Sequence, residues 1–181
     1  MKNPIPSDEW KYYLPLDSIG SMLELGNKKN EHGVYKDYFE GCGIRHVSVD
    51  WNGRNGALKL DLRLPIWEEV GQFDMVTNIG TTEHVARQAG VWENIHNCCR
   101  VGGFIVSVTP RPGDWWWHGE WYPTEKFYQV FAELNGYQIE MQGIEREQPN
   151  RNNCVRMKRT SRRIFTMPDM GYLYHNKPRS R

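Results

Sequence analysis

The chain has 181 residues, eight tryptophans and a formal net charge of +1. A charge so close to zero gives no global reason to expect nucleic acid or a membrane surface as partner, and no apolar stretch is long enough to span a bilayer. The length favours a single domain, residues 1–181, that buries a hydrophobic core large enough to need no disulfides or metal ions. Four cysteines without CxxC spacing favour reduced thiols and no metal site, and with no signal-peptide pattern they predict a cytoplasmic location.

Residues 1–16 are predicted to form an amino-terminal arm. Three prolines discourage regular structure there, and Trp10, Tyr12 and Tyr13 supply apolar surface. The arm would be either a strap over the edge of the sheet or a lid over a ligand.

The segment from Ser21 to Asp50 predicts the centre of the fold and a nucleoside site. An apolar strand breaks at Leu25-Gly26, a short amphipathic helix covers 33–40, and a β-branched strand ends on Asp50. A glycine turn with ligand-facing N–H groups, followed by an acid that accepts from both ribose hydroxyls, is typical of nucleoside binding. The turn is not GxGxxG, which disfavours a dinucleotide. Glu24, at the tip of the first strand, instead suits a cationic ligand such as an ammonium group.

Two side chains after Asp50 predict an adenine site. Trp51, in a turn, offers a ring that can lie flat on adenine. The next predicted strand, Ala57 to Leu62, places Asp61 near its end, where a carboxylate can accept from an exocyclic amine. Asp61 alone could equally be a turn residue, but two acids at the ends of consecutive strands strengthen the prediction.

The rest of the chain alternates helix and strand, which predicts a doubly wound parallel sheet. The predicted elements are helical turns at 65–70, a strand at 75–79 that breaks at Gly80, a helix that His84 opens and that runs through Cys99 to Gly102, a strand at 104–108 and a capped helix at 124–135. Strand candidates at 137–144 and 153–160 flank a polar turn and suit a hairpin, so one of them should run antiparallel. Right-handed crossovers put the loops on one carboxyl edge, where such sheets bind ligands.

Two segments are too apolar to face solvent alone. The loop from Arg111 to Pro123 holds Trp115, Trp116, Trp117, His118, Trp121 and Tyr122, and flat rings of this kind stack on sugar-like molecules. The basic and aromatic tail, 161–181, is predicted to pack back on the domain or on a second subunit of a homo-oligomer.

Five short motifs in order resemble those of class I S-adenosylmethionine-dependent methyltransferases, over residues 21–160. The motifs are Leu23-Glu24-Leu25-Gly26, Val49-Asp50, Leu60-Asp61-Leu62, Phe73-Asp74-Met75-Val76 and Val101-Gly102-Gly103-Phe104. This resemblance implies an α/β, Rossmann-like fold whose mostly parallel sheet has seven strands and a reversed C-terminal hairpin. It also implies S-adenosylmethionine as cofactor and a small-molecule acceptor.

The same resemblance implies a place for each part of the cofactor. The residues implied are Glu24 and Gly26 beside the methionine moiety, Asp50 at the ribose, Asp61 and Leu62 around the adenine, and Asn78 and Gly80 near the sulfonium. Lys28 and Lys29 depart from the family's glycine-rich loop. The aromatic loop, together with the arm, would bind the acceptor, and the tail would be dispensable for cofactor binding.

Methyl transfer is an in-line displacement, so the protein mainly aligns donor and nucleophile and excludes water. An oxygen nucleophile also needs a base, and Glu83, His84 and His118 are the candidates in the relevant loops. His84 could equally cap its helix. The fourth strand ends Thr-Asn-Ile-Gly rather than Asn/Asp-Pro-Pro-aromatic, which disfavours methylation of amino groups on DNA bases.

Three functions remain open at this point. We favour an enzyme that methylates an oxygen of a polar or sugar-like small molecule. The altered first loop supports a cofactor-binding protein without turnover, and only the basic tail, with Arg159, Arg162 and Arg163 close together, supports an RNA methyltransferase. A nicotinamide oxidoreductase is disfavoured by the glycine pattern and by the lack of a Tyr-x-x-x-Lys pair after the fourth strand.

Overall fold

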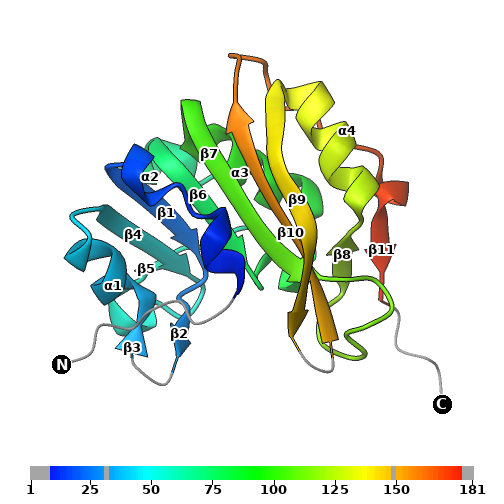
Figure 1. Cartoon of the computed structure of the whole chain (residues 1–181), viewed down its shortest axis with the longest axis horizontal. Helices are drawn as coiled ribbons and strands as arrows, with labels where there is room; N and C mark the ends of the chain where they lie inside the picture. Colours follow the sequence, from blue (N-terminus) through cyan, green and yellow to red (C-terminus); the bar gives the residue numbers. More distant parts are fainter. Residues whose placement is uncertain (1–8, 31–32, 148–149, 177–181) are drawn as a thin grey trace.

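A seven-stranded sheet forms the centre of the computed structural model, which describes residues 9–30, 33–147 and 150–176 (Figure 1). Its strands lie in the order β5-β4-β1-β6-β7-β10-β9. Their bounds are β1 Ser21–Leu25, β4 Arg45–Asp50, β5 Leu58–Lys59, β6 Phe73–Ile79, β7 Cys99–Pro110, β9 Tyr137–Glu147 and β10 Asn150–Arg159.

The predicted fold class is confirmed. Strands β5, β4, β1, β6 and β7 pair in parallel, and β10 runs antiparallel to both β7 and β9. The reversed strand is therefore the last one, inserted between β7 and β9. Because the five parallel strands end at one edge, the loops that follow β1, β4 and β6 meet there.

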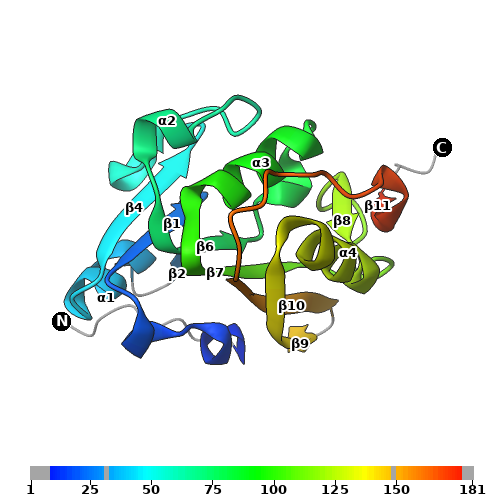
Figure 2. The same ribbon diagram turned by 90° about the horizontal axis from the view of Figure 1, so that it is seen from above.

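The larger core lies on one face of the sheet, under α2 (Trp67–Val70), α3 (Gln88–Cys98) and α4 (Glu125–Asn135) (Figure 2). Trp92 of α3 packs against Phe127 and Phe131 of α4, with ring centroids 4.8 and 5.4 Å apart. Helix α4 begins and ends as the sequence predicts, because the Thr124 hydroxyl accepts from the Phe127 N–H and Gly136 takes the left-handed conformation. Among the described residues, the helices are too short or too polar to cross a bilayer.

The opposite face is covered by α1 (Tyr35–Gly41) and by the described part of the amino-terminal arm (Figure 2). Leu14 is buried in this second core. The Tyr13 hydroxyl lies so close to Gly143 on β9 that a Cβ added to this glycine would be 2.7 Å from it. Residues 9–19 therefore form a strap that lies over this face of the sheet and reaches its edge strand, β9. Residues 1–8 and the side chain of Trp10 lie outside the described part.

Three local predictions are wrong. Strand β5 covers only two of the six residues predicted, because Gly53, Asn55 and Gly56 are left-handed before it and the chain turns again at Asp61. Helix α3 begins at Gln88, and His84 belongs to a separate 3₁₀ turn, Thr82–His84, whose carbonyl at Thr82 accepts from the Gln88 side chain. Cys99 starts β7 instead of continuing the helix.

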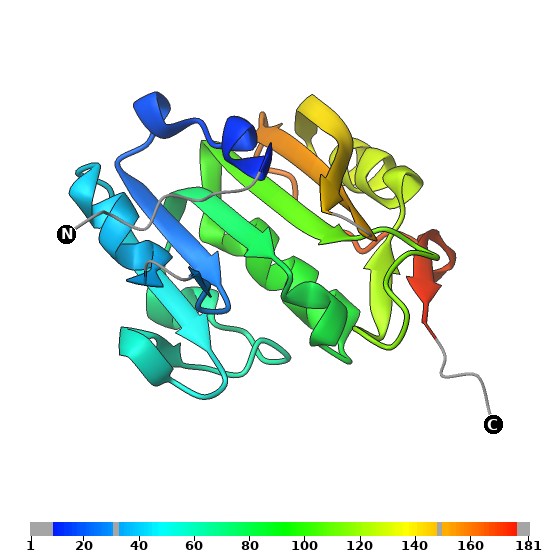
Figure 3. The ribbon, with the colours of Figure 1, turned by 60° about the horizontal axis from the view of Figure 1, so that its bottom comes forward.

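The tail packs back on the domain, as predicted. Phe165, Met167 and Leu173 join the core over α3 and α4. The tail also forms a strand that the sequence did not predict, β11 (Leu173–His175), antiparallel to β8 (Trp121–Pro123) at the end of the aromatic loop (Figure 3). A further pair, β2 (Lys29–Asn30) and β3 (Gly33–Val34), closes the loop after β1.

Candidate active site

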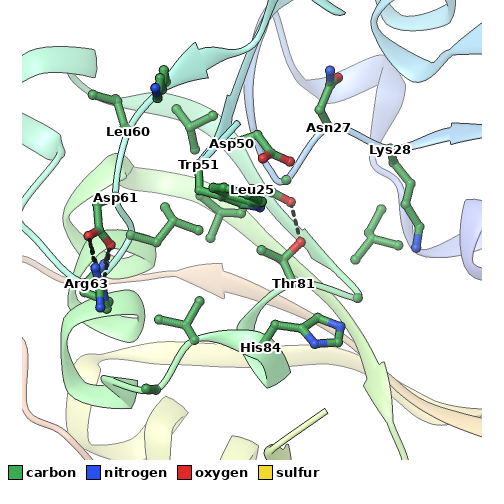
Figure 4. Close-up of a pocket in the computed structure, with 18 residues that line it drawn as sticks. Leu25, Asn27, Lys28, Asp50, Trp51, Leu60, Asp61, Arg63, Thr81 and His84 are labelled. Atoms are coloured by element: carbon green, nitrogen blue, oxygen red, sulfur yellow. Dashed lines mark hydrogen bonds and ion pairs between the residues drawn. The ribbon is translucent and has the colours of Figure 1, made fainter. Parts of the chain in front are cut away.

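A cavity of about 820 Å³ opens where the loops after β1, β4 and β6 meet (Figure 4). Its volume lies within the range of small-molecule sites. Seven residues that the sequence predicts for the site line it: Gly26, Asp50, Trp51, Asp61, Leu62, Gly80 and His84. The cavity therefore lies at the carboxyl edge of the sheet, beside the strands for which the sequence predicts a ligand site.

The floor of the cavity requires a glycine at position 26. Gly26 has a φ of 81°, and a Cβ there would stand 2.6 Å from the Thr81 hydroxyl oxygen. That hydroxyl donates to the Leu25 carbonyl at 2.7 Å, which fixes the loop after β6 to the end of β1 (Figure 4). Thr81 carries no motif signal, so the sequence analysis missed it.

Asp50 and Trp51 lie together at the end of β4. One carboxylate oxygen of Asp50 accepts from the Asn52 N–H at 2.9 Å, and among the described residues the other has no hydrogen-bond donor. The Trp51 side chain is 78% exposed and lies between Asp50 and Asp61 (Figure 4). This pair offers an acceptor oxygen and a flat apolar ring to a ligand in the cavity.

Asp61 lines the cavity but already has a partner. Arg63 donates to it through Nε at 3.0 Å and through Nη2 at 2.6 Å, and these hydrogen bonds lower the pKa of the Asp61 carboxyl. The remaining lone pairs of the carboxylate could still accept from a ligand amine. Arg63 is a second residue at this site that sequence reasoning missed.

Glu24 does not line the cavity. Its side chain is 1% exposed, one oxygen accepts from the Lys28 N–H at 2.9 Å, and the other lies 3.0 Å from the His46 Nε2. Alternation along β1 points Leu23 and Leu25 to the larger core and Glu24 to the opposite face. Glu24 thus holds the turn after β1 and pairs with His46, instead of facing a ligand.

Asn78 is also buried and does not line the cavity. Its side chain donates to the hydroxyls of Thr82 and Ser107, both at 2.9 Å, and accepts from the Thr82 N–H at 3.0 Å. It therefore shapes the turn that carries Glu83 and His84. Gly80, in contrast, lines the cavity, and a Cβ there would stand 3.1 Å from the Lys28 Nζ.

Glu83, His84 and His118 form one cluster beside the cavity. The Glu83 Oε1 lies 3.7 Å from the His118 Nε2 and 4.0 Å from the His84 Nε2, and the two imidazole centroids are 4.9 Å apart. Burial lowers the pKa of His84, Glu83 opposes this shift, and the electrostatic interactions with His118 and Lys28 lower the pKa further. His84 also lines the cavity, so the cluster reaches its wall.

The aromatic loop closes over Glu83 rather than over the cavity. The Glu120 N–H donates to the Glu83 carbonyl at 2.7 Å, and a Cβ at Gly119 would stand 2.7 Å from the Glu83 Cγ. Tyr122, predicted to bind substrate, is fully buried: its hydroxyl donates to the Trp115 carbonyl at 2.6 Å and accepts from the Gly119 N–H at 2.9 Å. Tyr122 therefore holds the loop in shape.

The four tryptophans of the loop have different surroundings. Trp115 packs on His118 at 4.9 Å and donates to the Arg151 carbonyl at 2.8 Å. Trp121 is partly buried against His175, whereas Trp116 and Trp117 are 54% and 66% exposed. Neither these rings nor residues 9–19 of the arm line this cavity, so their role in binding an acceptor stays a prediction.

Several solved structures with a similar fold are named as methyltransferases. No protein-family model matches the sequence, and no curated protein matches it. A putative S-adenosylmethionine-dependent methyltransferase from Listeria monocytogenes is 13% identical with a TM-score of 0.64, covering 84% of this chain and 96% of its own. The 1,6-didemethyltoxoflavin-N1-methyltransferase of Burkholderia thailandensis, solved with S-adenosylhomocysteine, is 15% identical with a TM-score of 0.59. The match covers 81% of this chain and 73% of that one.

A third similar structure is an O-methyltransferase from a trans-AT polyketide synthase of Brevibacillus brevis, also in complex with S-adenosylhomocysteine. It is 9% identical with a TM-score of 0.56, and the match covers 81% of this chain and 69% of that one. At these identities the likeness establishes the class I methyltransferase fold, as the motifs implied, and leaves activity to the residues of the site.

Proposed function

We propose that this protein transfers a methyl group from S-adenosylmethionine to an oxygen of a polar or sugar-like small molecule. The observation that carries the proposal is that one cavity is lined by Asp50 and Trp51 and also by His84, which lies beside Glu83 and His118. Two similar structures named above contain S-adenosylhomocysteine, which supports the choice of cofactor.

The residues of the cavity fit the parts of this cofactor. The Asp50 oxygen without a donor can accept hydrogen bonds from the ribose hydroxyls. Trp51 and Leu62 can contact the adenine ring, and the Asp61 carboxylate can accept from its amine. Lys28, the departure from a glycine-rich loop, puts an ammonium group close to Gly80, where it suits the carboxylate of the methionine moiety. When bound, the cofactor supplies an electrophilic methyl group on a sulfonium.

The cluster beside the cavity supplies what an oxygen acceptor needs. A hydroxyl group attacks poorly while it keeps its proton, and a site near Glu83, His84 and His118 could remove that proton or stabilise its loss. The lowered pKa of His84 keeps its imidazole neutral at neutral pH. A cytoplasmic location belongs to the same proposal and is supported by the spacing of the cysteines, which favours reduced thiols.

Calorimetric titration and labelled methyl transfer test this function together. The purified protein should bind S-adenosylmethionine and S-adenosylhomocysteine, and should transfer labelled methyl to members of a panel of polyols, glycosides and phenols. Binding without transfer to any acceptor would favour a methyltransferase-like binding protein. Transfer to RNA, with an affinity that falls steeply with salt, would favour the nucleic-acid alternative. A protein that binds a nicotinamide dinucleotide and neither of these two ligands would overturn the proposal.

A further inference from the structure

The Glu83 carboxylate is buried without the partners that a buried charge needs. Its side chain is 0% exposed, and among the described residues neither oxygen has a hydrogen-bond partner. An isolated carboxylate in such a place is strongly destabilised unless a cation or several donors compensate for its charge. The fold holds Glu83 there firmly, through the backbone hydrogen bond from Glu120 and the close packing of Gly119.

The groups nearest to this carboxylate are two imidazoles that face one oxygen. Their Nε2 atoms lie 3.7 and 4.0 Å from the Glu83 Oε1, too far for a hydrogen bond but close enough to share an ion with it. No ion pair joins Lys28 to Glu83 within the described part of the chain, although the Lys28 ammonium lies near Gly80. Among the described residues, the two imidazoles are therefore the only basic groups within ion-pair distance of the Glu83 carboxylate.

We propose that Glu83, His84 and His118 bind a divalent metal ion, with Zn²⁺ as the best match. One ligand atom from each side chain can be chosen so that all three lie within 4.8 Å of one another. Tetrahedral Zn²⁺, with bonds of about 2.0–2.1 Å, separates its ligand atoms by roughly 3.4 Å, so small rotations would complete the site. Two imidazoles and one carboxylate are a common ligand set of catalytic zinc and disfavour Mg²⁺ or Ca²⁺, which prefer oxygen.

The side chains are suited to such a closure. His84 and His118 have side chains 47% and 41% exposed, so their rings have room to rotate toward the fixed carboxylate. Three protein ligands leave a fourth position open, as in catalytic zinc sites. The sequence did not predict this site, because its three ligands come from two loops that only the fold brings together.

The role of the metal, though not its binding, rests on the proposed methyl transfer. Since His84 lines the cavity, the open position would face it and could take the hydroxyl oxygen of the acceptor. A coordinated hydroxyl loses its proton more easily, and that proton would pass to solvent. The oxygen would then bond to the methyl carbon while the electron pair of the broken C–S bond stays on sulfur. In this arrangement the imidazoles are ligands, not bases.

The test measures metal binding by itself. Protein dialysed against a chelator should bind one Zn²⁺ per chain in calorimetry, and Co²⁺ at the same site should give the visible absorption of a four-coordinate ion. Glu83→Gln and His118→Ala should each weaken Zn²⁺ binding about 100-fold or more. His175→Ala is the matched control, since it removes a partly exposed imidazole 3.2 Å from another carboxylate, Glu120, and should leave Zn²⁺ affinity unchanged. Lys28→Met removes a nearby positive charge and should strengthen binding.

Two results would overturn the metal site: Zn²⁺ binding that is equally tight in wild type and Glu83→Gln, or wild type that binds no Zn²⁺. Circular dichroism of each variant checks that the fold is intact. Methyl transfer that persists fully after chelation would leave the proposed function standing and remove the metal from it. Zn²⁺ binding by a protein that binds no S-adenosylmethionine would leave the site standing and remove the proposed function.

Discussion

The backbone of Gly119 lies directly against the side chain of Glu83. A Cβ at position 119 would stand 2.7 Å from the Glu83 Cγ and 2.8 Å from its Cβ. The burial of the carboxylate therefore depends on a glycine in a different loop, and this contact determines how the aromatic loop approaches the turn after β6.

Replacing Gly119 by Ala should lift the aromatic loop from Glu83. Overpacking of this kind costs about 1–3 kcal/mol, which urea unfolding would measure as a lower midpoint. Gly20→Ala is the matched control, because a Cβ there would meet nothing closer than 3.6 Å and its φ is not left-handed. Equal midpoints for the two variants would mean that the loop yields without cost.

Asp50→Ala should weaken S-adenosylhomocysteine binding by about two orders of magnitude or more. Hydrogen bonds to a charged group contribute about 1.5–3 kcal/mol each, and about 1.4 kcal/mol corresponds to a tenfold change in Kd. Asp50→Asn keeps the shape without the charge and should fall between wild type and Asp50→Ala. Asp17→Ala, an exposed acid on the arm, is the calorimetric control. The same Kd in all four proteins would remove Asp50 from the site.

Tyr122→Phe separates a structural role from substrate binding. The change removes a buried hydroxyl that bonds the Trp115 carbonyl, the Gly119 N–H and the Asn176 side chain, and the loss of these hydrogen bonds should cost about 1–3 kcal/mol of unfolding free energy. Tyr12 is 69% exposed, so Tyr12→Phe should not measurably lower the free energy of unfolding. An unchanged stability combined with a raised KM for the acceptor would restore Tyr122 as a substrate ligand.

His96 should make the protein less stable in acid. Burial, and then the positive charge of Arg159, lower the pKa of His96 from 6.5 to about 4. Between these pH values the unfolded chain binds a proton that the folded chain does not, so stability is full above pH 6.5 and falls as the pH approaches 4. The expected loss in free energy of unfolding is up to roughly 3 kcal/mol.

The comparison for this prediction is His96→Gln, measured by urea unfolding at several pH values. Carboxylates also titrate in this range, so only the difference between variant and wild type reports on His96. The variant should lose less stability than wild type between pH 6.5 and 4. Parallel curves would assign the acid sensitivity to other groups.

Truncation after Ser161 should destabilise the domain rather than only lower its solubility. The removed segment carries Phe165, Met167 and Leu173 into the core, and Asn176, whose side chain donates to the Gly119 carbonyl and to the Tyr122 hydroxyl, both at 2.9 Å. We expect a lower melting temperature and a changed elution volume. A monomer with unchanged melting would show that these contacts contribute little, and the predicted dispensability of the tail for cofactor binding would then stand.

The regular helices and strands of the fold could be predicted from local patterns in the sequence. The apolar run that breaks at Gly26, the β-branched strand that ends at Asp50, and the stripe between Thr124 and Gly136 each follow from periodicity and capping, which act over a few residues. A parallel sheet built from such units must collect its loops at one edge, so the general position of the cavity also followed from the sequence.

Tertiary structure alone decided which of those loop residues meet. Strand alternation turns Glu24 away from the cavity, and hydrogen bonds to Thr82 and Ser107 bury Asn78, although both stand at the right strand ends. Glu83 and His118 come together because β8 pairs with β11 and Tyr122 fixes the loop between them. Contacts of this kind depend on how irregular segments pack across the fold, and no periodicity in the sequence records that packing.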